Sequence, residues 1–159
     1  FEFLILEGFQ AGLSWLTILK KRENFRKAFD KFDFKKVAKY DQRKINFLLK
    51  DSGIIRNKLK IESAVINAKA YIEVRKEFGT FSKYIWKFTG GKPIHNRIGS
   101  IKEIPTRTEL SDLISKDLKK RGFKFVGSTI VYAHMQATGM VNDHVKSCFR
   151  YKEIIEKYG

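Results

Sequence analysis

The sequence is poor in several residues that define whole classes of protein. It contains a single cysteine, Cys148, which excludes a disulfide-stabilised fold and suits a reducing compartment. Two prolines and eleven glycines among 159 residues exclude a collagen-like or low-complexity chain. No apolar run approaches the ~18–20 residues that a membrane span requires. We therefore expect a cytoplasmic protein that has no membrane partner.

Acidic residues are scarce relative to basic ones. The chain has 33 Lys and Arg against 17 Asp and Glu, a net charge of +16. This excess predicts an anionic partner, with nucleic acid favoured over an anionic membrane surface, although a generally basic solvated surface would give the same count. The 14 Phe argue against disorder, and 159 residues suffice for one domain with its own core.

Apolar residues recur at helical spacing along nearly the whole chain, which predicts an all-α domain. We expect helices over about residues 15–29, 41–53, 58–78, 109–121 and 128–138, with shorter ones after Asp33 and after Thr80 or Ser82. Ser14, Asp33 and Asp41 are the expected N-caps of the helices that follow them. Residues 89–105 contain both prolines and three glycines, which predicts an irregular connection.

The strongest local signal is the turn from Gly122 to Gly127, between the last two of these helices. Gly127 lets the backbone approach a ligand, and the amides of Ser128 and Thr129 would open a helix N-terminus, where anions bind. The surrounding basic residues are Lys116, Lys119, Lys120, Arg121 and Lys124. Such a turn can hold a DNA phosphate without reading base sequence. An ordinary helical hairpin with glycines for a tight turn is the alternative interpretation.

Five segments resemble, in the same order, the motifs of the 3-methyladenine DNA glycosylase I family. They are residues 6–23, 53–56 (GIIR), 104–106 (IPT), 119–127 (KKRGFKFVG) and 139–144 (GMVNDH). The resemblance implies a single all-α domain over 1–159 with a helix-hairpin-helix DNA-binding element. Residues 34–140 would form the helix-hairpin-helix lobe, and residues 1–33 with 141–159 the terminal lobe.

The family's activity sets the expected function. The resemblance implies a monomeric, bacterial DNA repair glycosylase that flips 3-methyladenine out of alkylated double-stranded DNA and hydrolyses its N-glycosidic bond. Family members leave the strand uncut, and Thr129 stands where related glycosylase/lyases carry a lysine nucleophile. A non-catalytic helix-hairpin-helix DNA-binding module, or an inactive truncated relative, is the alternative; a base-release assay separates the two.

The resemblance assigns the base pocket to Glu7 and Trp15. Glu7 corresponds to the family's base-recognising acid and is our predicted catalytic residue. N3-methyladenine in DNA is cationic, so its glycosidic bond is already weak and a carboxylate in an apolar pocket complements it. Trp15 would stack on the flipped base with a cation–π contribution of ~0.5–2 kcal/mol. Without the resemblance, Glu7 would be interpreted as an exposed helix acid. For Trp15, a role in the core is the alternative even with the resemblance.

The DNA contacts follow from the same resemblance. Gln10 and Leu13 correspond to residues that fill the gap left by the extruded base, whose unstacking costs about a few kcal/mol. For Leu13, core packing is the alternative. The residues expected to hold the DNA backbone are Gly122, Lys124, Gly127, Ser128 and Thr129.

His144 and Cys148 are the candidate metal ligands. Four residues apart on a helix, they would share one face and supply half of a tetrahedral Zn²⁺ site. The resemblance implies a structural zinc whose other Cys and His come from an N-terminal segment. Because the chain lacks an initial Met, we expect residues before Phe1 to supply them, with further aromatic pocket residues. Asp143 is interpreted as a helix cap or a supporting group of the zinc site, and His95 and His134 have no assigned role beyond packing or surface.

Overall fold

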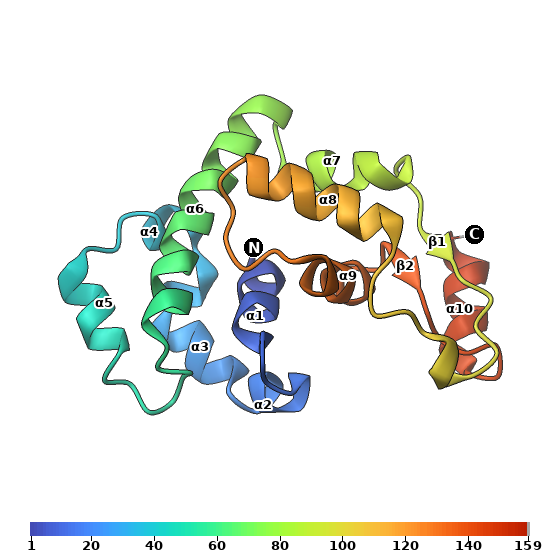
Figure 1. Cartoon of the computed structure of the whole chain (residues 1–159), viewed down its shortest axis with the longest axis horizontal. Helices are drawn as coiled ribbons and strands as arrows, with labels where there is room; N and C mark the ends of the chain where they lie inside the picture. The colour runs from blue at the N-terminus through green and yellow to red at the C-terminus, as the bar shows by residue number, and fades with distance from the viewer. Residues whose placement is uncertain (159) are drawn as a thin grey trace.

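The computed structural model describes residues 1–158, and its regular secondary structure is almost entirely helical (Figure 1). They are α1 (Glu2–Gln10), α2 (Trp15–Lys20), α3 (Arg22–Ala28), α4 (Phe34–Val37), α5 (Gln42–Leu48), α6 (Lys58–Phe78), α7 (Phe81–Trp86), α8 (Glu109–Lys120), α9 (Ser128–Ala137) and α10 (Phe149–Tyr158). Two short strands, β1 (Ile94–His95) and β2 (Val141–Asn142), pair in parallel with Ile94 opposite Val141. The predicted all-α class is confirmed. In the described range, no helix is long and apolar enough to cross a membrane.

Short polar side chains begin many of these helices. Ser14, Asp33, Asp41 and Thr80 each accept a hydrogen bond from a backbone amide in the first turn of the helix that follows, as the sequence predicts. Each such cap stabilises its helix by about 1 kcal/mol. Helix α6 has the predicted bounds, 58–78, and stops at Gly79, whose φ of +78° an L side chain rarely adopts.

The expected helix over residues 15–29 is wrong in one respect, because it breaks at Lys21 into α2 and α3. Lys21 Nζ donates to the carbonyls of Ser52 and Gly53 at 3.1 and 3.3 Å, and Asn24 also donates to Gly53. These hydrogen bonds hold the 51–55 loop beside the junction of α2 and α3. The expectation that Gly53 ends the preceding helix is also wrong: α5 stops at Leu48, and Gly53 lies in the loop that contacts α3.

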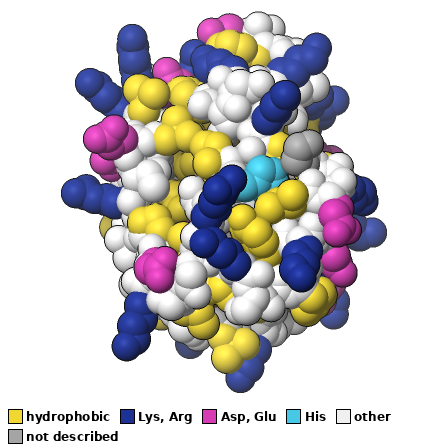
Figure 2. All heavy atoms as spheres, turned by 90° about the vertical axis from the view of Figure 1, so that its right-hand side faces the viewer, with side chains coloured by type: hydrophobic (Ala, Val, Ile, Leu, Met, Phe, Trp, Pro, Cys, Tyr) yellow, Lys and Arg dark blue, Asp and Glu magenta, His cyan; other side chains and the backbone are white. Residues whose placement is uncertain are grey.

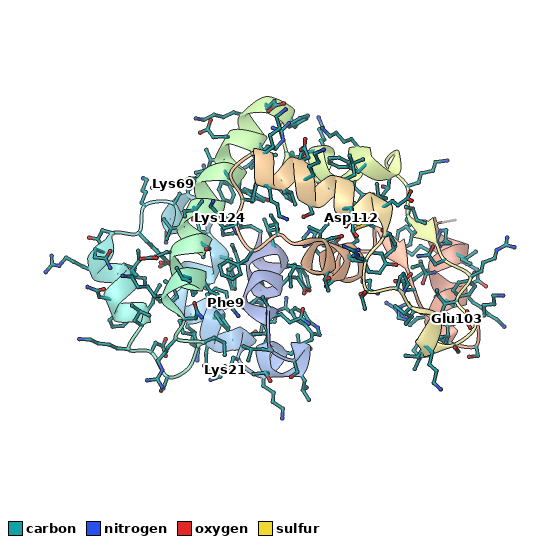
Figure 3. All side chains as sticks on the ribbon, viewed as in Figure 1. Phe9, Lys21, Lys69, Glu103, Asp112 and Lys124 are labelled. Carbon is teal, nitrogen blue, oxygen red and sulfur yellow. The ribbon has the colours of Figure 1, made fainter. Side chains whose placement is uncertain are left out.

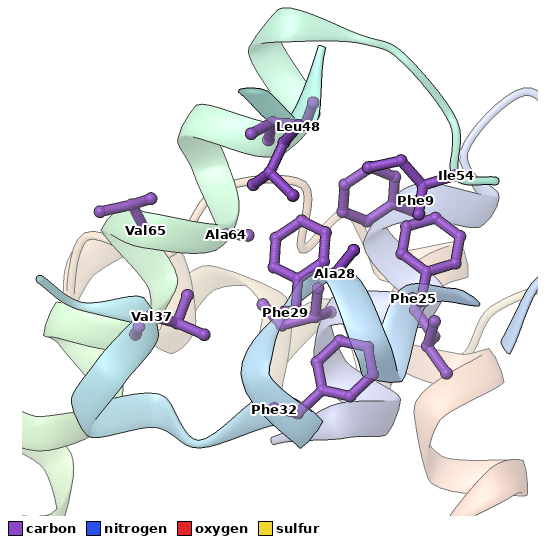
Figure 4. Close-up of a cluster of buried hydrophobic side chains, with 14 of the residues drawn as sticks. Phe9, Phe25, Ala28, Phe29, Phe32, Val37, Leu48, Ile54, Ala64 and Val65 are labelled. Atoms are coloured by element: carbon purple, nitrogen blue, oxygen red, sulfur yellow. The ribbon is translucent and has the colours of Figure 1, made fainter. Parts of the chain in front are cut away.

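Two buried apolar clusters meet at α1 and α6. The first is rich in phenylalanine (Figure 4): Phe9 packs edge-on against Phe25, with ring centroids 4.7 Å apart, and Phe29 stacks on Phe32. The second lies under α7, α8 and α9 and includes Tyr84 and Tyr132. From α1, Ile5, Leu6 and Phe9 belong to the first cluster and Leu4 to the second, so this helix packs between α6 and α9 (Figure 1).

The position of α1 between the two clusters places the carboxylate of Glu7 inside the molecule. The predicted division into a 34–140 lobe and a terminal lobe stays a prediction, and its last residue, Gly159, lies outside the described residues.

Candidate active site

A cavity of about 460 Å³ lies between α1, α2, α9 and the segment that follows β2. From the N-terminal helices it is lined by Glu7, Gln10 and Trp15. The opposite wall consists of Ala133, Gln136, Ala137, Gly139, Val141, Asn142, Asp143 and His144, with Ile104 and Ile154. Its volume lies within the ~300–1,000 Å³ typical of small-ligand sites. The structure thus places the predicted acid and the predicted indole at one cavity.

Glu7 is buried, with 2% of its surface exposed. Its Oε2 has no hydrogen-bond partner and no cation pairs with it among the described residues, so burial raises its pKa to about 7. A buried carboxylate without a donor is energetically unfavourable. A cationic, amino-bearing ligand would supply both the missing charge and the missing donor. The interpretation of Glu7 as an exposed acid is therefore wrong.

Gln10 and Leu13 lie at the edge of the same region. Gln10 lines the cavity, and its Oε1 is buried without a hydrogen-bond partner. Leu13 follows in the α1–α2 loop and is 40% exposed, which excludes its alternative role as a core residue. Trp15, the first residue of α2, is only half-buried and so presents part of its surface to the cavity.

The α8–α9 hairpin leaves its helix N-terminus open. Gly127 is the N-cap of α9 and supplies no side chain, so the first amides of α9 are free to meet another acceptor. A Cβ atom built at Gly127 would meet nothing within 4 Å, so the space in front of it is open. The Ser128 and Ser111 hydroxyls are hydrogen-bonded to each other at 2.7 Å. At the start of α9, the groups left for anion binding are therefore the backbone amides of Ser128 and Thr129.

Two buried polar side chains that sequence reasoning missed hold the hairpin in shape. Asn67 of α6 accepts from the Lys124 amide at 2.7 Å and donates to the Lys124 carbonyl at 3.0 Å. Ser115 donates to the Val126 carbonyl at 2.6 Å. A polar residue at an otherwise apolar position of a predicted helix is the signal that could have identified both.

The basic residues around the hairpin differ in their availability. Lys116, Lys119, Lys120 and Lys124 are exposed, and Figure 3 shows Lys124 at the hairpin beside α6. Arg121 instead bonds Glu77 at 2.6 Å and Asp117 at 2.8 Å. Its guanidinium also lies 5.0 Å from the Tyr84 ring centroid. Arg121 is therefore committed to the fold, whereas the lysines remain free for an anion.

Figure 2 extends this basic character to the α10 side of the molecule, where Lys and Arg side chains project over most of the face around patches of apolar surface. Acidic side chains are fewer there and lie mainly toward its edges. Basic side chains therefore occur on this face as well as at the hairpin, so a basic patch alone does not locate the site.

The candidate metal ligands meet in a turn and not on a helix, which corrects the sequence-based expectation. The Lys146 amide donates to the Ile98 carbonyl at 3.0 Å, which draws residues 144–148 into a turn before α10 begins at Phe149. His144 Nδ1 and Cys148 Sγ lie 3.8 Å apart. Two ligands of one tetrahedral zinc are separated by about 3.6 Å, given ordinary Zn–N and Zn–S bonds. The pair fits half a site, and residues 1–158 contain no cluster of three or more His, Cys, Asp or Glu ligands.

Asp143 is a fully bonded carboxylate in the wall of the cavity. It accepts from Asn96 at 2.7 Å, from the Tyr132 hydroxyl at 2.8 Å and from Gln136 at 2.7 Å. All these partners are side chains, so its interpretation as a helix cap is wrong. Because Asp143 links β2 to α9 and to the segment after β1, it shapes the wall opposite Glu7.

Comparison with known proteins gives the same assignment throughout. Residues 1–151 match the family described as methyladenine glycosylase. The chain is 50% identical over 148 residues to the DNA-3-methyladenine glycosylase of Haemophilus influenzae, covering 93% of this chain and 80% of that protein. It is 49% identical over 151 residues to DNA-3-methyladenine glycosylase 1 of Escherichia coli K12, covering 95% and 81%.

Solved structures agree with the sequence relatives. A crystal structure of 3-methyladenine DNA glycosylase I superposes with a TM-score of 0.90 at 47% identity, covering 93% of this chain and 81% of that one. The 3-methyladenine DNA glycosylase I of Staphylococcus aureus superposes with a TM-score of 0.91 at 36% identity, covering 93% and 79%. Fold, sequence and the placement of the motif residues lead to one conclusion: the chain belongs to the methyladenine glycosylase family.

Proposed function

We propose that the protein is a bacterial DNA repair enzyme that releases 3-methyladenine from alkylated double-stranded DNA by hydrolysing its N-glycosidic bond. The observation that carries the proposal is the buried, unpaired carboxylate of Glu7 in a cavity of about 460 Å³ that Trp15 also lines. Relatives with about 50% sequence identity are named DNA-3-methyladenine glycosylases, and the crystal structure of one similar glycosylase contains bound 3-methyladenine.

The chemistry needs little beyond such a pocket. The C1′–N9 bond breaks with its electron pair moving to the cationic purine, which leaves as neutral 3-methyladenine. A water molecule adds to C1′ and loses a proton, so the products are the free base and an abasic site. Glu7 accepts hydrogen bonds from the extruded base and opposes its charge, and Trp15 stacks on it. No lysine nucleophile is required, in agreement with Thr129 at the start of α9.

The open helix N-terminus of α9 and the exposed lysines of the hairpin would hold the DNA backbone. Gly122, Lys124, Gly127, Ser128 and Thr129 form this part of the proposed interface, and the half-exposed Leu13 with Gln10 would fill the gap in the duplex. A monomer suffices, because every residue that the mechanism invokes comes from one chain.

The same family membership supports a structural zinc bound by His144 and Cys148. The 3.8 Å separation of Nδ1 and Sγ fits two ligands of one ion. The other two ligands of a four-coordinate site would come from outside residues 1–158. When bound, zinc would stabilise the turn before α10 and take no part in bond cleavage. Metal analysis of the protein expressed with its complete coding sequence tests this: about one zinc per chain is expected, lost in Cys148→Ser.

Base release from N-methylated duplex DNA tests the proposed activity. We expect the parent protein to release 3-methyladenine, and Glu7→Gln to lower the rate roughly 10²-fold, the usual effect of removing one electrostatic group of a transition state. Trp15→Ala should also lower it, with DNA affinity reduced far less. Glu73→Gln, an exposed acid on α6, is the matched control. Salt-sensitive DNA binding without any base release by the parent would instead establish the non-catalytic module.

A further inference from the structure

One lysine of α6 is buried beneath the end of α1. Lys60 is 8% exposed and is the single Lys or Arg among residues 1–158 that is buried. Its Nζ donates to the carbonyl of Phe9 at 3.0 Å and to that of Ala11 at 2.5 Å, and Figure 3 shows Phe9 beside α6. No carboxylate of the described residues pairs with it. Because a buried lysine requires a compensating partner, the two carbonyls take the place of an acid.

Both carbonyls lie at the C-terminal end of α1. The last carbonyls of a helix lack intrahelical partners, and the helix dipole favours a cation beside them. Helix α1 carries no basic residue in its own last turn, so Lys60 of α6 provides that charge. Since Phe9 and Ala11 are the two neighbours of Gln10, one ammonium group holds the backbone on both sides of that residue.

The turn between α1 and α2 has no other polar link to the rest of the protein. Within the described range, the two Lys60 bonds are the only hydrogen bonds that join residues 9–14 to a distant segment. The remaining ones are local, such as that from the Leu13 amide to the Gln10 carbonyl at 2.6 Å. Leu13 is exposed, and Gln10 lines the cavity with an unpartnered Oε1. The placement of both proposed gap-filling side chains therefore depends on Lys60.

The same face of α6 also holds the α8–α9 hairpin. Asn67 lies seven residues after Lys60, which is about two helical turns or ~10 Å along the axis, and it bonds both backbone groups of Lys124. Gly8 of α1 approaches the hairpin closely, since a Cβ atom built on it would lie 3.5 Å from Phe125 Cβ. Helix α6 thus sets the spacing between the turn proposed to enter the duplex and the hairpin proposed to hold its backbone.

We propose that Lys60 is a positioning residue for gap filling: its ammonium group fixes the α1–α2 turn so that Gln10 and Leu13 enter the duplex where the base has left. This inference rests on the proposed function. A turn that is ordered before DNA binds loses little further conformational entropy on binding, so its side chains offset the lost stacking more fully. An apolar side chain in place of Lys60 would fill the same space and leave the turn free to move.

Binding to two DNA duplexes tests the proposal without any base release. One duplex is intact, and the other carries a tetrahydrofuran residue, an abasic-site analogue in which the gap is already present. The readout is the ratio of the two dissociation constants, measured by fluorescence anisotropy, because a loss of folded protein or of one positive charge changes both constants alike. We expect the parent to prefer the abasic duplex and Lys60→Met to lower that preference by roughly fivefold.

Further variants show whether Lys60 acts through the turn. Lys60→Arg keeps donors for both carbonyls and should retain most of the preference. Gln10→Ala with Leu13→Ala removes the gap-filling side chains, and adding Lys60→Met to that pair should lower the ratio no further. Lys76→Met, at the other end of α6 and exposed, should keep the parent ratio. An unchanged ratio in Lys60→Met, or an equal further drop when it is added to the alanine pair, would overturn the proposal.

Backbone order in the free parent protein gives a second test that needs no variant. Relaxation of ¹⁵N should give the Gly12 and Leu13 amides order parameters of about 0.85, as in rigid helices, and values below about 0.6 would refute the proposal. The base-release assay reports separately on the proposed function. Absent release with a Lys60-dependent preference contradicts the enzyme and not the turn, whereas normal release without such a preference contradicts the turn and not the enzyme.

Discussion

The cavity that we propose binds the base is lined by two carboxylates, and their surroundings differ in opposite ways. Asp143, on the wall that follows β2, accepts three hydrogen bonds from three side chains. Glu7, on α1, accepts no hydrogen bond from the described residues at its buried oxygen, and its pKa rises to about 7. The bonded acid stabilises the wall, whereas the unbonded acid keeps its capacity for a ligand at a cost to the fold.

Two cations of the α8–α9 hairpin differ in the same way as these two acids. Arg121 is bonded to Glu77 and Asp117 and stacked on aromatic rings, while Lys124 is exposed. In both regions the bonded charge stabilises the fold, and we propose that the unbonded charge binds the ligand. The following substitutions test this division.

Replacing the bonded acid should have the largest effect on stability. Asp143→Ala leaves Asn96, Tyr132 and Gln136 without their shared acceptor, so we expect a loss of about 3 kcal/mol in the free energy of unfolding. Urea unfolding at pH 7 measures it. Glu153→Ala, an exposed acid on α10, is the control, and equal stabilities of the two variants would contradict the assigned role of Asp143.

Replacing the unbonded acid should act in the opposite direction. Glu7→Gln removes a buried charge that no donor compensates, so at pH 8 we expect the variant to be more stable than the parent by roughly 1–3 kcal/mol, while base release falls. Thermal unfolding in parallel with the release assay measures both quantities. A Glu7→Gln protein less stable than the parent at pH 8 would mean that the acid contributes to the fold.

The pH dependence of stability sharpens the same point. The pKa of Glu7 is raised from 4.5 in the unfolded chain to about 7 in the folded protein, so between these values the folded state retains a proton that the unfolded chain has released. The Glu7 contribution to stability is therefore lost as pH rises from about 4.5 to 7 and is constant above that range. The stability advantage of Glu7→Gln over the parent should therefore grow as pH rises from about 4.5 to 7 and stay constant above pH 7. A difference independent of pH would place the pKa of Glu7 at its ordinary value.

The smallest expected effects concern the two cations of the hairpin. Lys124→Gln should lower DNA affinity and reduce the slope of log Kd against log salt by about one, with stability unchanged. Arg121→Gln should cost roughly 1–2 kcal/mol of stability because it breaks charged hydrogen bonds, and leave the salt slope unchanged. Fluorescence anisotropy on duplex DNA at several salt concentrations, together with urea unfolding, measures both. Equal salt slopes in the two variants would contradict the assignment of Lys124 to DNA binding and of Arg121 to the fold.

Local signals in the sequence predicted much of the fold. Caps such as Asp33 and Asp41 act within a few residues of the helices they start, and α6 has an apolar pattern long enough to define both of its ends. The break at Lys21 and the turn at 144–148 escaped prediction because each depends on a carbonyl from elsewhere, Ser52 in one case and Ile98 in the other. Such contacts leave no local periodicity.

The sequence by itself determined the helical class, the open glycine hairpin and, through its motifs, the family and the residues Glu7 and Trp15. Those properties reside in short stretches of chain, where residue type and spacing act directly. Only the tertiary structure decided that Glu7 lacks a donor while Asp143 has three, and that Arg121 is committed to the fold while Lys124 is exposed. Whether a charge is compensated depends on groups up to tens of residues away, and burial then sets the energy of that difference.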